Sequence, residues 1–357
     1  MEGQKDRFGE LDLIRFFAAV SVLIYHYKTK YIESLGANPS LADLIYSITK
    51  FGYLGVDLFF IISGFVIFAS ALDRTAFQFA VSRITRLYPT LWVCVSITAI
   101  SSLLLRGIDS KITVTQWLAN LTLFNRRLGI EDIDGVYWTL EVEIKFYFCI
   151  LVLVTCGLIR HYKLWIPAWL AATASFLVLK QPFFMGWFIS PEYSSYFIAG
   201  IIFYLIRKDG FRFFHAAILA PAMVISSVHA YRMISSFSKN VSEEDRFIAV
   251  GIVWCLYALF FIIATKKFTV RSSATVAAIG GTTYPLYLLH NRMGKEMYDA
   301  FSGTISPLCL ILLIAALIHL ASWLIHRYLE RSIADRIKQY LFTLSTRLSL
   351  SRSKTRA

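Results

Sequence analysis

Arg15 and His26 are two chemically active residues that share one face of the first apolar segment of the sequence. They lie eleven positions apart, which on a helix brings them within about 20° of the same face, with an axial rise of about 16 Å. An ionisable side chain inside a membrane segment is costly unless it is paired or hydrated, so each residue is a hypothesis of function. Asp12 could instead simply pair with Arg15 at i, i+3. We interpret the two residues as a cation and an imidazole at different depths of one path.

A carboxylate without a local cation follows in the segment 138–147. Glu141 and Lys145 stand there at i, i+4 with the glutamate first, which is the favourable order for a helical ion pair. Glu143 is left on the other side of the helix, and we expect it at the depth of His26. A carboxylate beside an imidazole can orient it as a general base. A buried structural carboxylate is an equal alternative.

Arg83 and Arg86 stand at i, i+3 at the entrance to the third apolar segment. Two guanidinium groups in this arrangement form a fork that suits phosphate oxygens. Read alone, the pair is most often only the excess of positive charge that membrane proteins place on the cytoplasmic side. Because Arg15 is expected near the same side, a cytoplasmic anion site built from three arginines becomes a hypothesis.

Asp57 and His290 are two further ionisable residues at ends of apolar segments. For Asp57 we slightly favour a structural cap or pair over a chemical role. For His290, substrate binding and an interfacial position without a role are equal interpretations. The cysteines form no Cys-x-x-Cys pair and no Cys/His cluster, so the sequence predicts neither disulfides nor a metal site; they are Cys94, Cys149, Cys156, Cys255 and Cys309.

The elements that must position these residues are apolar helices of membrane-spanning length. Hydrophobic residues make up 57% of the 357 and charged residues only 17%, whereas a soluble domain carries about a quarter charged residues. Apolar stretches of about 20 residues recur, which is the length that crosses a bilayer. We therefore predict an all-α integral membrane protein, a bundle of about ten transmembrane helices. The expected ranges are 11–30, 51–72, 87–105, 136–159, 164–180, 193–207, 213–230, 247–265, 273–291 and 305–326.

Two of these ranges are weak or ambiguous. The ninth is interrupted by Gly280, Gly281 and Pro285. Lys5 and Arg7 ahead of the first apolar run superficially suggest a signal peptide. However, ionisable residues interrupt that run and no small-residue cleavage site follows, so we expect a retained first helix.

The distribution of Lys and Arg predicts the orientation. The net charge is +13, but the basic residues sit in short connectors rather than in one basic domain, which argues against nucleic acid as a partner. With the N-terminus inside, the inner connectors hold 13 Lys/Arg in 41 residues and the outer ones 13 in 95. This bias predicts that both termini are cytoplasmic. We divide the chain into a membrane domain at 1–330 and a basic cytoplasmic tail at 331–357, where a surface-lying amphipathic helix and a solvated tail are equal alternatives.

Several local patterns together resemble the family-3 membrane acyltransferases, bacterial enzymes that O-acylate cell-surface glycans. The likeness runs in family order over almost the whole chain. It is carried by Arg15-x10-His26, by Gly55-Val-Asp57-Leu-Phe-Phe60 followed by Ser63-Gly-Phe65, by Arg83-x-x-Arg86, by Trp138-Thr-Leu-x-Val-Glu143-x-x-Phe-Tyr147, and more weakly by Tyr284-Pro-Leu-Tyr-Leu-Leu-His290 and Tyr328-Leu-Glu-Arg331. Two positions depart from the family pattern, Leu13 and Ser332, and neither is a proposed reacting group.

The resemblance implies that an acyl group, usually acetyl, passes from cytoplasmic acyl-CoA to a hydroxyl of an extracytoplasmic glycan, with no metal. In this interpretation the three arginines hold the CoA phosphates, His26 takes the proton from the acceptor hydroxyl, and Glu143 orients His26. Direct transfer and an acyl-His26 intermediate both stay open. The expected location is the bacterial inner membrane. Supporting or substrate-binding residues would be Asp57, Ser63, Trp138, Tyr147, Tyr284 and His290.

A competing class is a proton-coupled transporter or an exporter of glycan or acyl groups, since buried His, Glu and Arg also mark transport paths. The sequence shows no inverted repeat, which weakens this alternative. The acceptor, the acyl chain and the oligomeric state are not predicted.

Overall fold

The computed structural model describes residues 8–35, 39–180, 185–238 and 241–354, and this part of the chain is helical apart from short connections. Each of the ten expected ranges overlaps one long helix, so the predicted all-α membrane fold is confirmed. These helices are α1 (Gly9–Leu35), α3 (Gly55–Ala71), α4 (Ala76–Arg106), α6 (Trp138–Thr155), α7 (Tyr162–Leu179), α9 (Pro191–Asp209), α10 (Phe213–Phe237), α11 (Glu243–Ala264), α12 (Ala274–Leu289) and α14 (Pro307–Leu324). Shorter or peripheral helices are α2 (Pro39–Thr49), α5 (Val114–Asn120), α8 (Met185–Phe188), α13 (Arg292–Phe301) and α15 (Arg331–Lys354). Lys5 and Arg7 lie outside the described residues.

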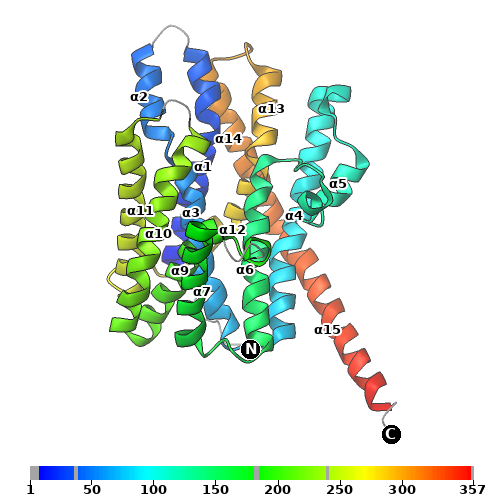
Figure 1. The fold of residues 1–357 in the computed structure, drawn as a ribbon. Coiled ribbons are helices and arrows are strands. Elements are labelled where there is room, and N and C mark those ends of the chain that lie inside the picture. The colour runs from blue at the N-terminus through cyan, green and yellow to red at the C-terminus, as the bar shows by residue number, and fades with distance from the viewer. Residues whose placement is uncertain (1–7, 36–38, 181–184, 239–240, 355–357) are drawn as a thin grey trace.

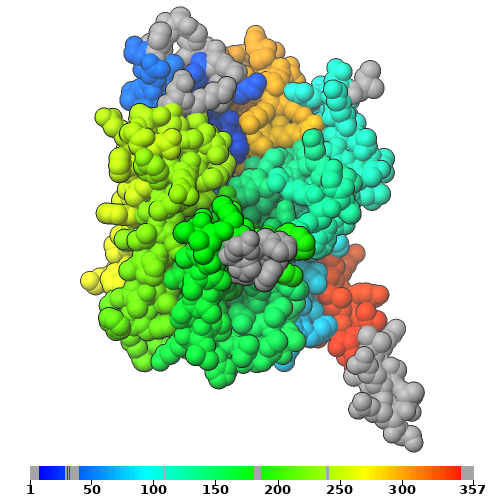
Figure 2. Space-filling model, in the orientation of Figure 1, coloured from blue at the N-terminus to red at the C-terminus, as the bar shows by residue number. Residues whose placement is uncertain are grey.

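The helices form one bundle with α1, α3, α9 and α12 toward its interior. Helix α3 packs along α9 and α1 packs along α12, while α10 and α11 cover one flank and α4 and α14 the other (Figure 1). In the space-filling view, side chains of α7, α10 and α11 close the surface, and α1 emerges only near the upper end (Figure 2). The described chain begins and ends toward the lower end of the bundle (Figure 1).

Six helical stretches of the described chain are long and apolar enough to cross a membrane: Ser40–Ala71, Ala76–Arg106, Tyr162–Leu179, Phe213–Phe237, Glu243–Ala264 and Pro307–Thr346. The other four expected spans, α1, α6, α9 and α12, do not meet the same standard. Helix α12 has only 16 residues, and α1 carries Asp12, Arg15 and His26. Helices α1, α9 and α12 lie toward the interior of the bundle, and an interior helix can be short or charged because protein rather than lipid surrounds it. The number of spans therefore stays a prediction.

The two glycines of the ninth range do not interrupt a helix, contrary to our expectation. Helix α12 is continuous through Gly280, Gly281 and Pro285. A Cβ atom on Gly280 would lie 2.5 Å from Oδ1 of Asp12, and one on Gly281 would overlap the imidazole ring of His326. Both glycines are contact points where side chains of other helices approach the α12 backbone closely.

Two connectors matter for the site. The long loop between α4 and α6 lies at the upper end of the bundle and contains α5 and short 3₁₀ turns (Figure 1). A π-helical turn, η5 (Ile325–Glu330), joins α14 to α15, which runs down from there past the lower part of α4 (Figure 1). The tail is thus helical from Arg331, and its position on a membrane surface stays a prediction.

Candidate functional site

A cavity of about 850 Å³ opens between α1, α3, α4, α6 and α12; we call it the lower cavity. Its lining runs along α3 from Val56 to Ser70, an axial length of about 21 Å. It gathers side chains from seven separate parts of the sequence, since Tyr204 of α9 and the segment from His326 to Arg331 also contribute. Seven of the eleven predicted site residues line it: Arg15, Ser63, Arg83, Arg86, Glu143, Tyr147 and Tyr284.

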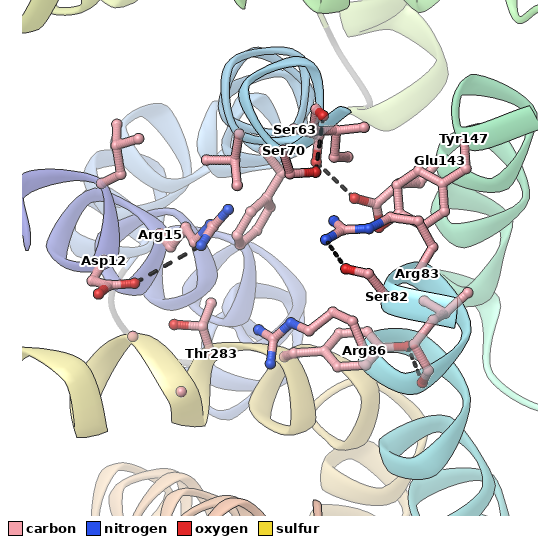
Figure 3. Close-up of a pocket in the computed structure, with 18 of the residues that line it drawn as sticks. Asp12, Arg15, Ser63, Ser70, Ser82, Arg83, Arg86, Glu143, Tyr147 and Thr283 are labelled. Atoms are coloured by element: carbon pink, nitrogen blue, oxygen red, sulfur yellow. Dashed lines mark hydrogen bonds and ion pairs between the residues drawn. The ribbon is translucent and has the colours of Figure 1, made fainter. Parts of the chain in front are cut away.

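The three predicted arginines point toward one another across the lower cavity (Figure 3). Nη1 of Arg15 lies 3.8 Å from Oδ1 of Asp12, the i, i+3 pair that the sequence offered as an alternative. The pair does not remove Arg15 from the site, because both residues also line the cavity. Arg15 therefore combines a helical partner with a position in the cavity wall.

Arg83 has only part of its guanidinium group hydrogen-bonded within the described residues. Its Nη2 donates to Oγ of Ser82 at 2.8 Å, and its guanidinium lies 5.7 Å from the ring centre of Tyr147. Its Nε is buried and has no hydrogen-bond partner among the described residues. A buried donor without a partner is costly, and an anionic ligand in the cavity would supply the missing acceptor.

Arg86 pairs with a carboxylate that the sequence analysis did not single out. It forms an ion pair with Glu330 of η5, and its guanidinium lies 5.9 Å from the ring centre of Tyr284. The second oxygen of Glu330 lies 2.8 Å from Nδ1 of His326. The only signal in the sequence was the weak Tyr328–Arg331 pattern. Arg74 and Arg331 also line this cavity and were missed.

Glu143 lies in the lower cavity and not beside His26. Its Oε1 accepts a hydrogen bond of 2.7 Å from Ser63. His26 shares its surroundings with Trp138, the first residue of α6, and Glu143 is five residues further along, about 7.5 Å down the helix. No contact joins Glu143 to His26 in the described part of the chain, so the expectation that the two residues share one depth is wrong. The predicted pair of Glu141 with Lys145 is present at 3.1 Å.

A second, smaller cavity of about 80 Å³ contains His26; we call it the upper cavity. Asp57 and Trp138 also line it, together with His229, which the sequence analysis missed. The two cavities share the wall residues Val56 and Tyr287. Arg15 and His26 therefore face two adjoining spaces along one side of α1, as their spacing predicted.

His290 lines neither cavity and is fully buried, so its side chain contacts only protein, and its depth in the membrane stays a prediction. It caps the C-terminus of α12, and its ring centre lies 5.1 Å from that of His26. Its Nδ1 lies 2.7 Å from the carbonyl oxygen of Tyr287. The imidazole ring of His290 therefore lies beside His26, where the sequence analysis had expected the carboxylate of Glu143.

A buried clasp at the upper end fixes the residues around His290. Asp134, just before α6, accepts hydrogen bonds of 2.7 Å from the side chain of Asn291 and from the backbone N–H of Arg292. Burial raises the pKa of Asp134, while these donors and the N–H of Val136 oppose the shift. The Arg292 side chain also binds Glu296 and the carbonyl oxygen of Ile133. The clasp ties the loop before α6 to the end of α12.

A family model and a known protein match the sequence of this chain. A family model described as an acyltransferase domain, of the acyltransferase-3 type, matches residues 8–327. Nodulation protein 10 of Rhizobium leguminosarum bv. viciae is 28% identical over 166 residues, which cover 41% of this chain and 43% of that protein. The chain thus aligns with less than half of that relative's length. No solved structure matches the chain.

Proposed function

Because the chain belongs to the acyltransferase-3 family, it is an acyltransferase, and we propose that it transfers an acyl group from cytoplasmic acyl-CoA to a hydroxyl of an extracytoplasmic glycan. Acetyl is the proposed acyl group and the bacterial inner membrane the proposed location. The observation that carries the proposal is the pair of adjoining cavities, one lined by arginines and the other containing His26.

The lower cavity suits the donor. CoA carries phosphates at one end and the thioester at the end of a long flexible arm, so it needs cations and an extended channel. Arg15, Arg83 and Arg86 come from two helices and converge on one space, and guanidinium groups bind phosphate oxygens with two parallel hydrogen bonds. The lining continues up α3 to Val56, which would bring the thioester to the boundary of the upper cavity.

The upper cavity suits the reacting hydroxyl of the acceptor. Aromatic rings with a few polar groups form the usual wall of a site that binds an organic ligand in one orientation. Here the polar groups are His26, Asp57 and His229, and the aromatic wall consists of Tyr25, Tyr53, Trp138, Tyr193, Phe237 and Tyr287. We place the acceptor hydroxyl beside His26 at the Val56–Tyr287 boundary.

In the proposed reaction, His26 takes the proton from the acceptor hydroxyl as its oxygen attacks the carbonyl carbon of the thioester. A C–O bond forms, the C–S bond breaks, and the CoA thiolate leaves with the proton returned by His26. The products are the O-acyl ester and free CoA, so no metal or redox partner is required. Glu143 would act within the lower cavity, near the donor, and not as the partner of His26.

The test uses purified protein in lipid vesicles with radiolabelled acetyl-CoA and a cell-surface polysaccharide. The expected result is alkali-labile label in the polysaccharide together with stoichiometric free CoA. A polysaccharide that stays unlabelled while label crosses the vesicle membrane would support the transporter or exporter alternative and overturn the transfer proposal.

The role of the arginines is tested with two donors that differ only in the phosphate-bearing end. Arg83→Gln should raise KM for acetyl-CoA about tenfold or more, since a charge-assisted hydrogen bond contributes about 1.5–3 kcal/mol. The same change should hardly alter KM for S-acetylpantetheine, which lacks phosphates. Arg106→Gln, at the other end of α4, is the control and should behave as wild type with both donors. Equal effects of Arg83→Gln on both donors would refute phosphate binding by this residue.

A further inference from the structure

His290 has a ring nitrogen that is buried and unpartnered. Its Nδ1 lies 2.7 Å from the Tyr287 carbonyl oxygen, and a carbonyl only accepts, so Nδ1 carries the ring proton. In the neutral ring Nε2 is then a bare acceptor. This atom is buried and finds no hydrogen-bond partner among the described residues. A doubly protonated ring would bury an unpaired charge instead, at a still higher cost.

The unpaired acceptor is Nε2 of His290, whose ring lies beside the ring of His26. The two ring centres are 5.1 Å apart and the ring planes make an angle of 52°. His26 lines the upper cavity, whereas His290 lines neither cavity. Within the described part of the chain, the His26 ring contacts the rings of Tyr25 and His290 and makes no hydrogen bond. With the ring centres 5.1 Å apart, rotation of the His26 ring can bring one of its nitrogens within hydrogen-bond distance of Nε2, and catalytic hydrogen bonds often form only when substrate binds.

The His290 ring is held by the Tyr287 carbonyl oxygen and by complete burial, and the backbone of His290 is also fixed. The Tyr27 hydroxyl donates to its carbonyl oxygen at 2.8 Å, and its N–H donates to the carbonyl of Leu286 at 3.1 Å. The next residue, Asn291, is fixed by Asp134 through the clasp described above. The cost of the unpaired Nε2 therefore persists in the unliganded protein, as expected for a preorganised group.

We propose that His290 is the positioning residue of His26: its Nε2 accepts the N–H of His26 and leaves the other nitrogen of His26 bare toward the upper cavity. This inference rests on the proposed function. When the acceptor hydroxyl loses its proton to His26, the N–H that faces His290 keeps its acceptor, so the imidazolium is stabilised. The proton then leaves with the CoA thiolate, and His290 begins and ends the cycle neutral. The Tyr287 carbonyl orients His290 in turn.

Three variants separate positioning from mere packing. His290→Phe fills the space but removes the acceptor, and His290→Gln restores an acceptor oxygen. His319→Phe, on the exposed side of α14, controls for loss of a histidine in the bundle. The thermal unfolding midpoint of each variant, measured in detergent, shows which of them stay folded.

The first readout does not need transfer activity. Diethyl pyrocarbonate modifies neutral imidazole, so the pH dependence of His26 labelling, followed by mass spectrometry, reports the pKa of His26. Loss of the acceptor destabilises the imidazolium, so the labelling curve should move to lower pH in His290→Phe and back toward wild type in His290→Gln. An unmoved curve in folded His290→Phe would overturn the proposal, whether or not the wild-type protein transfers acyl groups.

The second readout is kinetic. In His290→Phe, kcat should fall about 100-fold, within the range of general-base contributions, with KM for acetyl-CoA unchanged and the acidic limb of the pH profile at lower pH. His290→Gln should recover at least part of kcat, and His319→Phe should match wild type. Equal losses in the Phe and Gln variants would contradict positioning. Absence of transfer by the wild-type protein would instead reject the proposed function.

Discussion

Arg86 of α4 and Glu330 of the π-helical turn η5 form an ion pair between positions 244 residues apart. The pair joins the wall of the lower cavity on α4 to the segment that leads from α14 into α15. His326 binds the second carboxylate oxygen of Glu330 at 2.8 Å. Arg86, one of the three arginines that we assign to phosphate binding, is thus already paired with a carboxylate. A phosphate group would have to compete with Glu330 for its guanidinium.

A double-mutant cycle measures this pair. Arg86→Gln and Glu330→Gln should each lower the free energy of unfolding by about 1–2 kcal/mol, below the cost of breaking a fully buried pair because the Arg86 side chain is 40% exposed. The double variant should lose less than the sum, because each single change already removes the interaction. The measurement is denaturant unfolding in detergent. Strictly additive losses would mean that the pair contributes nothing.

His26→Ala should abolish acyl transfer while the protein stays folded in the membrane. Loss of a general base lowers rates by about 10²- to 10⁴-fold, and His26 lines the upper cavity at the side of α1. Transfer from labelled acetyl-CoA and the elution volume of the purified variant are measured together. A folded variant with full activity would refute the mechanism.

The helical period was enough to predict what lies along one helix. A rise of about 1.5 Å and a turn of about 100° per residue place Arg15 and His26 on one face at different depths, and the structure gives each of them its own cavity. The ion pair of Glu141 with Lys145 follows from the same local rule. Apolar length likewise located the helices, because a helix satisfies its own backbone hydrogen bonds within lipid.

The same period cannot predict how neighbouring helices are shifted along their axes. Glu143 was expected at the depth of His26, but α6 begins at that depth with Trp138, so Glu143 falls into the lower cavity. Contacts of Glu330 with Arg86 and of His290 with His26 join distant segments and have no local signature. The glycines of α12 were ambiguous for a related reason. In the sequence, a glycine that allows a neighbouring helix to pack closely cannot be told from a glycine that breaks its own helix.

The glycines of α12 allow a matched test of packing. Gly281→Ala should destabilise the protein by about 1–3 kcal/mol, the cost of an overpacked contact, since the added methyl group would overlap the His326 ring. Gly251→Ala in α11 is the control, because no atom lies within 4 Å of the place that a Cβ would occupy there. That change should be neutral or slightly stabilising, given the better helix propensity of alanine. Unfolding midpoints in detergent compare the two variants, and equal midpoints would show that α12 can move away from His326.

Val56 offers a test of the passage between the two cavities, since it lines both of them together with Tyr287. Val56→Phe should narrow the boundary and lower kcat at least tenfold. KM for acetyl-CoA should stay unchanged, because the arginines that we assign to its phosphates lie elsewhere in the lower cavity. Val56→Ala removes two methyl groups and should raise the relative rate with butyryl-CoA over acetyl-CoA by several-fold, since each buried CH₂ contributes about 0.8 kcal/mol.

The measurement is kcat and KM of both Val56 variants with acetyl-, propionyl- and butyryl-CoA. Ile67→Ala, on the same helix and on the wall of the lower cavity only, controls for a general loosening of α3. A change in chain-length preference that is as large in Ile67→Ala as in Val56→Ala would place the selective constriction below the boundary. A fall in kcat confined to Val56→Phe would mean that the acyl group passes between Val56 and Tyr287 on its way to His26.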